Sequence, residues 1–220
     1  MRRPQLPPSV SLMRIGLLGT GNVGRALATA WRAAGHDVLL GSRHPGERGD
    51  LGLPVAGLAE TAAHAQVLVN ATPGGASVDL LRSLGAEALA GLPLIDVGVG
   101  LSDDFTALAH PNSSLGEQIQ EAFPRTPVVK TLCTMDSTAM VAPGDLAGPS
   151  TVFLSGNDAA AKRTTATLLT DLGWPPDSHL DLGDITTARG QEHFALLFIG
   201  IMGALSTHTF NIKVVREAGA

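Results

Sequence analysis

A glycine-rich turn near the amino terminus constrains the fold of this chain more than any other feature. The turn Gly19-Thr20-Gly21-Asn22-Val23-Gly24 closes an apolar run at 14–19 and opens a segment, 22–35, whose apolar residues recur at helical spacing. A second apolar run follows at 37–40. This order of strand, turn, helix and strand is the βαβ unit in which such glycines let the backbone approach a pyrophosphate at the helix N-terminus. It predicts a dinucleotide site that includes all six residues of the turn.

The end of the second predicted strand indicates which dinucleotide is bound. NAD-binding proteins usually carry a carboxylate there, which bonds the ribose 2′-hydroxyl and would repel a 2′-phosphate. This chain has Gly41-Ser42-Arg43 instead. A hydroxyl and a guanidinium are suited to a phosphate. Ser42 and Arg43 therefore predict NADP(H) rather than NAD(H).

The strand and helix patterns continue to alternate along the chain, which predicts an α/β fold of the Rossmann type with a doubly wound parallel sheet. We expect a flexible tail at 1–12, an NADP-binding domain at 13–155, and a small, mainly helical C-terminal part at 156–220. Ligands bind at the carboxyl ends of the strands of such sheets. The loops after two later strands, Thr72-Pro73-Gly74-Gly75 and Val97-Gly98-Val99-Gly100, are therefore expected to complete the site through Thr72, Pro73 and Gly98. Further helices are expected at 78–89 and 114–123, with strands at 93–97 and 127–132.

A long helix is predicted over 187–209, and its apolar residues cover nearly all of its faces. A helix of this kind is normally buried on more than one side. Two compatible interpretations are a core helix of the C-terminal part and a helix shared across a homodimer interface. The apolar stretch 194–205 is too short for a bilayer, which needs roughly 20 residues.

Composition excludes several classes of function. The net charge of −5 gives no basic footprint for nucleic acid. The chain has one cysteine and lacks a signal-peptide core at its start, so we expect no disulfide, no membrane contact and a cytoplasmic location. It contains no tyrosine, which excludes the reductases that use a tyrosine as general acid on this fold.

Candidates for a proton donor are few. Cys133, Asp136 and His193 are weak candidates, and Lys130 lies in a strand sequence from whose end it could emerge. Each has a structural alternative: a buried small hydrophobe for Cys133, a helix cap for Asp136, and a surface residue for His193. No metal site is expected, because one cysteine and histidines without helical ligand spacing do not form one. The pair Asp103-Asp104 is interpreted as a helix start.

The motifs together resemble the F420-dependent NADP oxidoreductases, in particular their bacterial branch. The resemblance rests on the glycine turn, on Gly41-Ser42-Arg43, and on later segments such as Val128-Val129-Lys130-Thr131-Leu132 and Phe210-Asn211-Ile212-Lys213. It implies that Thr20, Gly21, Asn22 and Val23 hold NADP, with Ser42 and Arg43 on its 2′-phosphate. Archaeal members carry a histidine at the position of Cys133 and a bulky aromatic residue in the loop at 72–75.

Three functions are compatible with this sequence. The first is hydride transfer between NADPH and the deazaflavin coenzyme F420, which the resemblance implies. The second is NADPH-dependent reduction of a small imine, ketone or enone. The third is a non-catalytic NADP(H)-binding redox sensor.

Overall fold

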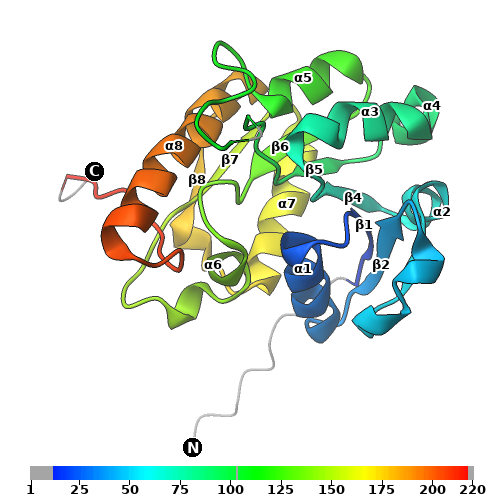
Figure 1. Ribbon diagram of the computed structural model, residues 1–220, viewed down its shortest axis with the longest axis horizontal. Coiled ribbons are helices and arrows are strands. Elements are labelled where there is room, and N and C mark those ends of the chain that lie inside the picture. The colour runs from blue at the N-terminus through cyan, green and yellow to red at the C-terminus, as the bar shows by residue number, and fades with distance from the viewer. Residues whose placement is uncertain (1–11, 103, 218–220) are drawn as a thin grey trace, which may run out of the picture.

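The computed structural model describes residues 12–102 and 104–217, and one eight-stranded sheet runs through it (Figure 1). The strand order is β3-β2-β1-β4-β5-β6-β7-β8. All neighbouring strands pair in parallel except β6 and β7, which are antiparallel. The strands are β1 (Arg14–Leu18), β2 (Asp37–Ser42), β3 (Val55–Gly57), β4 (Val67–Asn70), β5 (Leu94–Asp96), β6 (Val128–Thr131), β7 (Val152–Gly156) and β8 (His179–Asp181).

Helices cover both faces of the sheet, which gives three layers and two apolar cores. On one face, α1, α6 and α7 pack around Trp31 and Leu168. On the other, α2, α3, α5 and the first residue of α8 pack around Leu68 and Ile119. The helices are α1 (Asn22–Ala33), α2 (Leu58–His64), α3 (Gly74–Leu84), α4 (Ala86–Leu89), α5 (Leu115–Ala122), α6 (Ser137–Val141), α7 (Ala159–Asp171) and α8 (Ala188–Leu205).

The topology places a ligand crevice beside β1. After β1 the chain passes to β2 on one side, and β4 then pairs on the other side of β1. The crossovers to the two sides therefore diverge at β1 and β4, which opens a crevice at the carboxyl ends of these strands. The predicted doubly wound α/β fold is confirmed.

The segment after residue 155 continues the same architecture. The end of β7 and the whole of β8 belong to the common sheet, and α7 packs on β7 and β6. The division into two domains at residue 155 stays a prediction. The predicted tail at 1–12 lies, except for Leu12, outside the described residues.

Two predicted helices differ from the structure. The helix expected at 78–89 begins earlier, at Gly74, and is broken at Gly85, whose φ of 86° ends α3 before α4 starts. The helix start expected at Asp103-Asp104 was wrong for Asp104, because its carboxylate accepts hydrogen bonds from the Ser102 and Thr106 hydroxyls within a turn. Asp103 lies outside the described residues.

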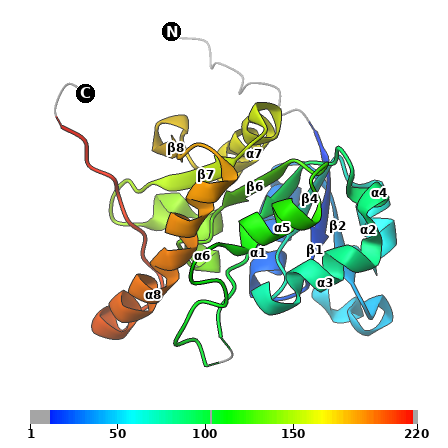
Figure 2. The ribbon, with the colours of Figure 1, turned by 90° about the horizontal axis from the view of Figure 1, so that it is seen from above.

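The long C-terminal helix α8 begins one residue later and ends four residues earlier than predicted, where Ser206 adopts a φ of 54°. Its carboxyl-terminal half reaches beyond the body of the sheet (Figure 2). Leu197 and Leu205 on this half are 58% and 59% exposed. Within the described residues no helix combines the length and apolar character needed to span a membrane. The cytoplasmic location stays a prediction.

Candidate functional site

A cleft of about 1010 Å³ lies at the carboxyl ends of β1, β2, β4 and β5. It brings together the glycine turn after β1, the segment after β2, and the loops after β4 and β5. Of the predicted cofactor residues, all but Gly24 line it: Gly19, Thr20, Gly21, Asn22, Val23, Ser42, Arg43, Thr72, Pro73 and Gly98. Their contact with a ligand stays a prediction, but the structure places them on one continuous surface.

The glycine turn leaves the start of α1 open to the cleft. A Cβ at Gly24 would lie 2.1 Å from the Gly19 carbonyl oxygen, so only glycine allows the helix to pack this close to the turn. A Cβ at Gly21 would meet no protein atom within 4 Å, so this backbone is open to a ligand. The helix has no side-chain cap, and the first N–H groups of a helix lack partners within it. This geometry fits a pyrophosphate, which the helix dipole also attracts.

Basic side chains gather at the β2 side of the cleft. Ser42 is buried, and its Oγ accepts a hydrogen bond from the His44 N–H at 3.0 Å. Arg43, His44 and Arg48 line the cleft around it. Among the ion pairs of the described residues, none involves Arg43 or Arg48. Two exposed guanidinium groups without a carboxylate fit a 2′-phosphate.

Arg48 was missed by the sequence reasoning. It lies beyond the strand end at which the NADP motif is read, at the junction of two short 3-10 turns. The signal that could have found it is the clustering of Arg43, His44 and Arg48 within six residues of sequence.

The loops after β4 and β5 close the other end of the cleft. The Thr72 hydroxyl is 2.6 Å from Asn70 Oδ1 and 2.9 Å from Ser77 Oγ, so it is held within the protein. Gly74 and Gly75, predicted as loop, form the first turn of α3. A Cβ at Gly74 would lie 2.2 Å from the Val99 carbonyl oxygen, so glycine allows α3 to start against the loop after β5.

None of the four proton-donor candidates, Cys133, Asp136, His193 and Lys130, lines the cleft. Cys133 is buried beside Gln191, and burial raises the pKa of its thiol to about 12. The Asp136 carboxylate caps α6 by accepting from the Thr138 and Ala139 N–H groups. His193 is exposed on α8. Cys133 and Asp136 therefore have structural partners in the protein, and a catalytic role for any of the candidates stays a prediction.

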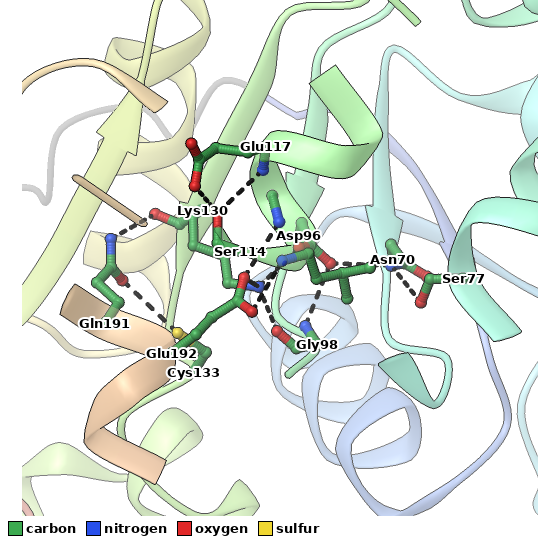
Figure 3. A network of polar contacts seen from close by, with 12 residues as sticks. Asn70, Ser77, Asp96, Gly98, Ser114, Glu117, Lys130, Cys133, Gln191 and Glu192 are labelled. Atoms are coloured by element: carbon green, nitrogen blue, oxygen red, sulfur yellow. Dashed lines mark hydrogen bonds and ion pairs between the residues drawn. The ribbon is translucent and has the colours of Figure 1, made fainter. Parts of the chain in front are cut away.

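A network of buried charges lies behind the cleft (Figure 3). Lys130 Nζ is 2.7 Å from both Asp96 Oδ2 and Glu192 Oε1. Burial raises the pKa of the Asp96 carboxyl. Burial alone would lower the pKa of Lys130, but the two carboxylates outweigh it and raise that pKa above its usual value. Asp96 lies on β5, Lys130 on β6 and Glu192 on α8. The side-chain amide of Gln191, the neighbour of Glu192, donates hydrogen bonds to the Lys130 carbonyl and to Ser155 Oγ.

The sequence indicates Lys130 only as a candidate proton donor and predicts no role for Asp96 or Glu192. A signal existed, because Asp96 and Lys130 stand in otherwise apolar strands, and charges in buried strands need a partner. The two residues are register partners across β5 and β6.

The described residues hold no group of three or more histidine, cysteine or acidic side chains arranged for a metal ion. The cleft fits an anionic dinucleotide instead. Its features are the uncapped start of α1, the open backbone at Gly21, and the cations Arg43 and Arg48, which form no ion pair with any other described residue.

Comparison with known proteins agrees with this geometry. The family model for NADP oxidoreductases that depend on coenzyme F420 matches residues 14–100. A crystal structure of a candidate F420-dependent NADP reductase from Arthrobacter sp. FB24 shares 45% identity at a TM-score of 0.87. The match covers 93% of this chain and all of that one.

More distant relatives share parts of this architecture. The metalloreductase STEAP3 of Rattus norvegicus is 30% identical over 185 residues, which are 83% of this chain but only 36% of STEAP3. A reductive aminase from Aspergillus terreus is 18% identical at a TM-score of 0.64 over 89% of this chain and 63% of its own, and it shows the shared fold alone. The whole-length match at 45% identity identifies the family. This chain belongs to the coenzyme F420-dependent NADP oxidoreductase family and is an NADP-dependent oxidoreductase.

Proposed function

We propose that this protein transfers hydride between NADPH and the deazaflavin coenzyme F420. The observation that carries the proposal is the chemical character of the cleft near β5. Thr72, Pro73 and Gly74 line it from one side, and Val97, Gly98 and Val99 from the other. These residues have no titratable side chain. The titratable groups of the cleft are Arg43, His44, Arg48 and Asp79, which come from the segment after β2 and from α3.

The orientation of NADP(H) follows from the two anchors. With the 2′-phosphate at Arg43 and the pyrophosphate at the start of α1, the nicotinamide half extends toward β4 and β5, because these strands lie on the other side of β1 from β2. The nicotinamide then lies against the loops at Thr72 and Gly98. Loops without titratable side chains can hold a ring in one orientation by contact.

Hydride transfer from NADPH to F420 forms NADP⁺ and, with one proton from solvent, reduced F420, so two stacked rings supply the chemistry. The protein then contributes orientation rather than acid–base catalysis. Reduction of a small imine or ketone would gain from a positioned proton donor. The described residues at this end of the cleft supply none, so the chemistry of the cleft favours F420 over such acceptors.

A direct assay tests the proposal. Purified protein mixed with F420 and NADPH should bleach the visible absorbance of the deazaflavin, and NADP⁺ with reduced F420 should restore it. Replacing NADPH by NADH should slow both directions, because Arg43 and Arg48 then lack the phosphate. Unchanged absorbance at micromolar enzyme, with NADPH shown to bind, would contradict F420 as the acceptor.

We also infer a homodimer that forms through α8. The stretch 194–205 contains no charged residue, and Leu196, Leu197, Met202 and Leu205 on it are each more than a third exposed. Several exposed apolar side chains on a helix that projects from the body favour association. A second copy could pair with the same surface by two-fold symmetry.

Light scattering tests the dimer. The wild-type protein should have twice the mass of the 22.6 kDa chain. Leu197→Glu, which places a charge in the proposed interface, should give monomers. Leu12→Glu is the matched control, because Leu12 is also an exposed leucine, at 68%, but precedes β1. A monomeric wild-type protein would refute this use of α8.

A further inference from the structure

The buried charges behind the cleft converge on the backbone of one residue of its wall, Gly98. Lys130 Nζ, which contacts the carboxylates of Asp96 and Glu192, also donates a hydrogen bond to the Gly98 carbonyl oxygen. The side chains of Lys130 and Asp96 are fully buried, and that of Glu192 is 3% exposed. Figure 3 shows these groups around Gly98.

Both polar groups of the Gly98 backbone are held by this cluster. Its N–H donates to Asp96 Oδ1 at 3.2 Å, and its carbonyl accepts from Lys130. Strand β5 ends at Asp96, so among the described residues no strand partner holds the backbone of Gly98. The side chains of Asp96 and Lys130 therefore set the orientation of the two peptide groups that meet at Gly98, which lines the cleft.

The cluster also reaches α5 and α8. Glu192, on α8, accepts hydrogen bonds from the N–H groups of Leu115 and Gly116 at 2.9 and 3.1 Å. These N–H groups begin α5, where a helix favours negative charge. Asp96 Oδ1 also accepts from Asn70 Nδ2 at 2.9 Å, and Asn70 Oδ1 accepts from the Thr72 hydroxyl. One network thus joins both loops at this end of the cleft to α8.

Stability alone does not account for such a cluster. Buried ion pairs add little net stability compared with apolar residues of similar volume, because desolvation offsets their attraction. The position of this cluster has a specific effect, since its one cation is shared between two carboxylates and a carbonyl of the cleft wall. The orientation of the backbone that contacts the nicotinamide matters for hydride transfer, because a small displacement of the reacting ring slows the reaction strongly.

We propose that Lys130, Asp96 and Glu192 are positioning residues for the nicotinamide half of bound NADP(H), which they orient through the backbone of Gly98. This inference rests on the proposed function only in assigning the nicotinamide to the β5 end of the cleft. The adenosine half, at Arg43 and the start of α1, lies outside their reach.

Two ligands distinguish an effect on the nicotinamide half from an effect on the adenosine half. Adenosine 2′,5′-bisphosphate contains only the adenosine half and its 2′-phosphate, whereas NADPH also carries the nicotinamide, whose fluorescence reports its environment. In Glu192→Gln, which keeps the shape of the side chain, affinity for the bisphosphate should stay within about twofold, and affinity for NADPH should fall about tenfold. The anisotropy of bound NADPH fluorescence should fall as well. Lys130→Met should show the same split, more strongly.

A matched control addresses loss of stability. Trp174→Phe removes a buried hydrogen bond to the Met140 carbonyl, outside the cleft, and should lower stability without changing the ratio of the two affinities. If Glu192→Gln weakens both ligands equally or neither, the positioning role is wrong, even if Lys130→Met does not fold. Wild-type protein that binds NADPH but does not reduce F420 overturns the proposed function and leaves this test intact. Wild-type protein that binds neither ligand overturns both.

Discussion

Replacing Lys130 by methionine is expected to lower the free energy of unfolding by about 3–5 kcal/mol at neutral pH. The substitution keeps most of the side-chain volume but removes the only cation from a cluster that holds two buried carboxylates. Asp96 and Glu192 would then face each other without a partner, and the Gly98 carbonyl would lose its donor. Urea denaturation, compared with wild type at the same pH, measures the loss.

The loss should depend on pH. Without Lys130, the pKa of the Asp96 carboxyl, already raised by burial, rises further in the folded state, while in the unfolded chain it returns to about 4. Because this folded-state pKa lies above the unfolded value, the protonated Asp96 carboxyl stabilises the folded variant in acid. That stability is lost as the pH rises through the folded-state pKa. The deficit of Lys130→Met should therefore be smaller at pH 5 than at pH 8.

Two comparisons make this result specific. Leu168→Ala removes apolar volume from the other core, so its deficit should not change between these two pH values. The triple variant Asp96→Asn, Lys130→Met, Glu192→Gln contains no buried charge at this site and should recover much of the lost stability. A deficit that is the same at both pH values would show that unpaired carboxylates are not its cause.

Arg43→Ala is expected to weaken NADPH binding about 10- to 100-fold while changing NADH binding by less than about threefold. A hydrogen bond to a charged group contributes about 1.5–3 kcal/mol, and tenfold in affinity corresponds to about 1.4 kcal/mol. Arg43 is exposed and lines the cleft next to the buried Ser42. Only the ligand with a 2′-phosphate should lose its contact. Fluorescence titration with both reduced nucleotides gives the two constants.

The control for this prediction is Arg32→Ala, which removes an exposed arginine from the last turn of α1, away from the cleft. It should leave both affinities unchanged. The loss of NADPH affinity caused by Arg43→Ala should also become smaller with added salt, because salt screens exposed charges. Equal weakening of NADPH and NADH by Arg43→Ala would contradict the placement of the 2′-phosphate at this position.

The nucleotide half of the site was predictable because its signals are local in sequence. Within the turn from Gly19 to Gly24, the approach of Gly24 to the Gly19 carbonyl is a contact between residues close in sequence. Ser42 and Arg43 follow β2 directly. A sequence pattern over 30 residues therefore predicts the geometry of this end of the cleft, and the structure places these residues together.

The nicotinamide half of the site depends on contacts between segments that are distant in sequence. Asp96, Lys130 and Glu192 are 34 and 62 residues apart, and their meeting depends on strand order and on the placement of α8. Strand order follows from the topology, but helical periodicity in α8 cannot select Glu192 as the buried residue over the exposed His193 beside it. The early start of α3 at Gly74 was missed for a related reason, because a Pro-Gly-Gly sequence is typical of a loop.

The uncapped start of α1 links the cofactor to the lifetime of the protein. A capping side chain typically contributes about 1 kcal/mol to a helix, and α1 has none. A bound pyrophosphate would satisfy these N–H groups, and any ligand of the native state alone stabilises it by mass action. The population of partly opened chains, which proteases degrade, would then decrease as the cellular pool of NADP(H) increases. The abundance of this enzyme would in this way follow the supply of its own cofactor.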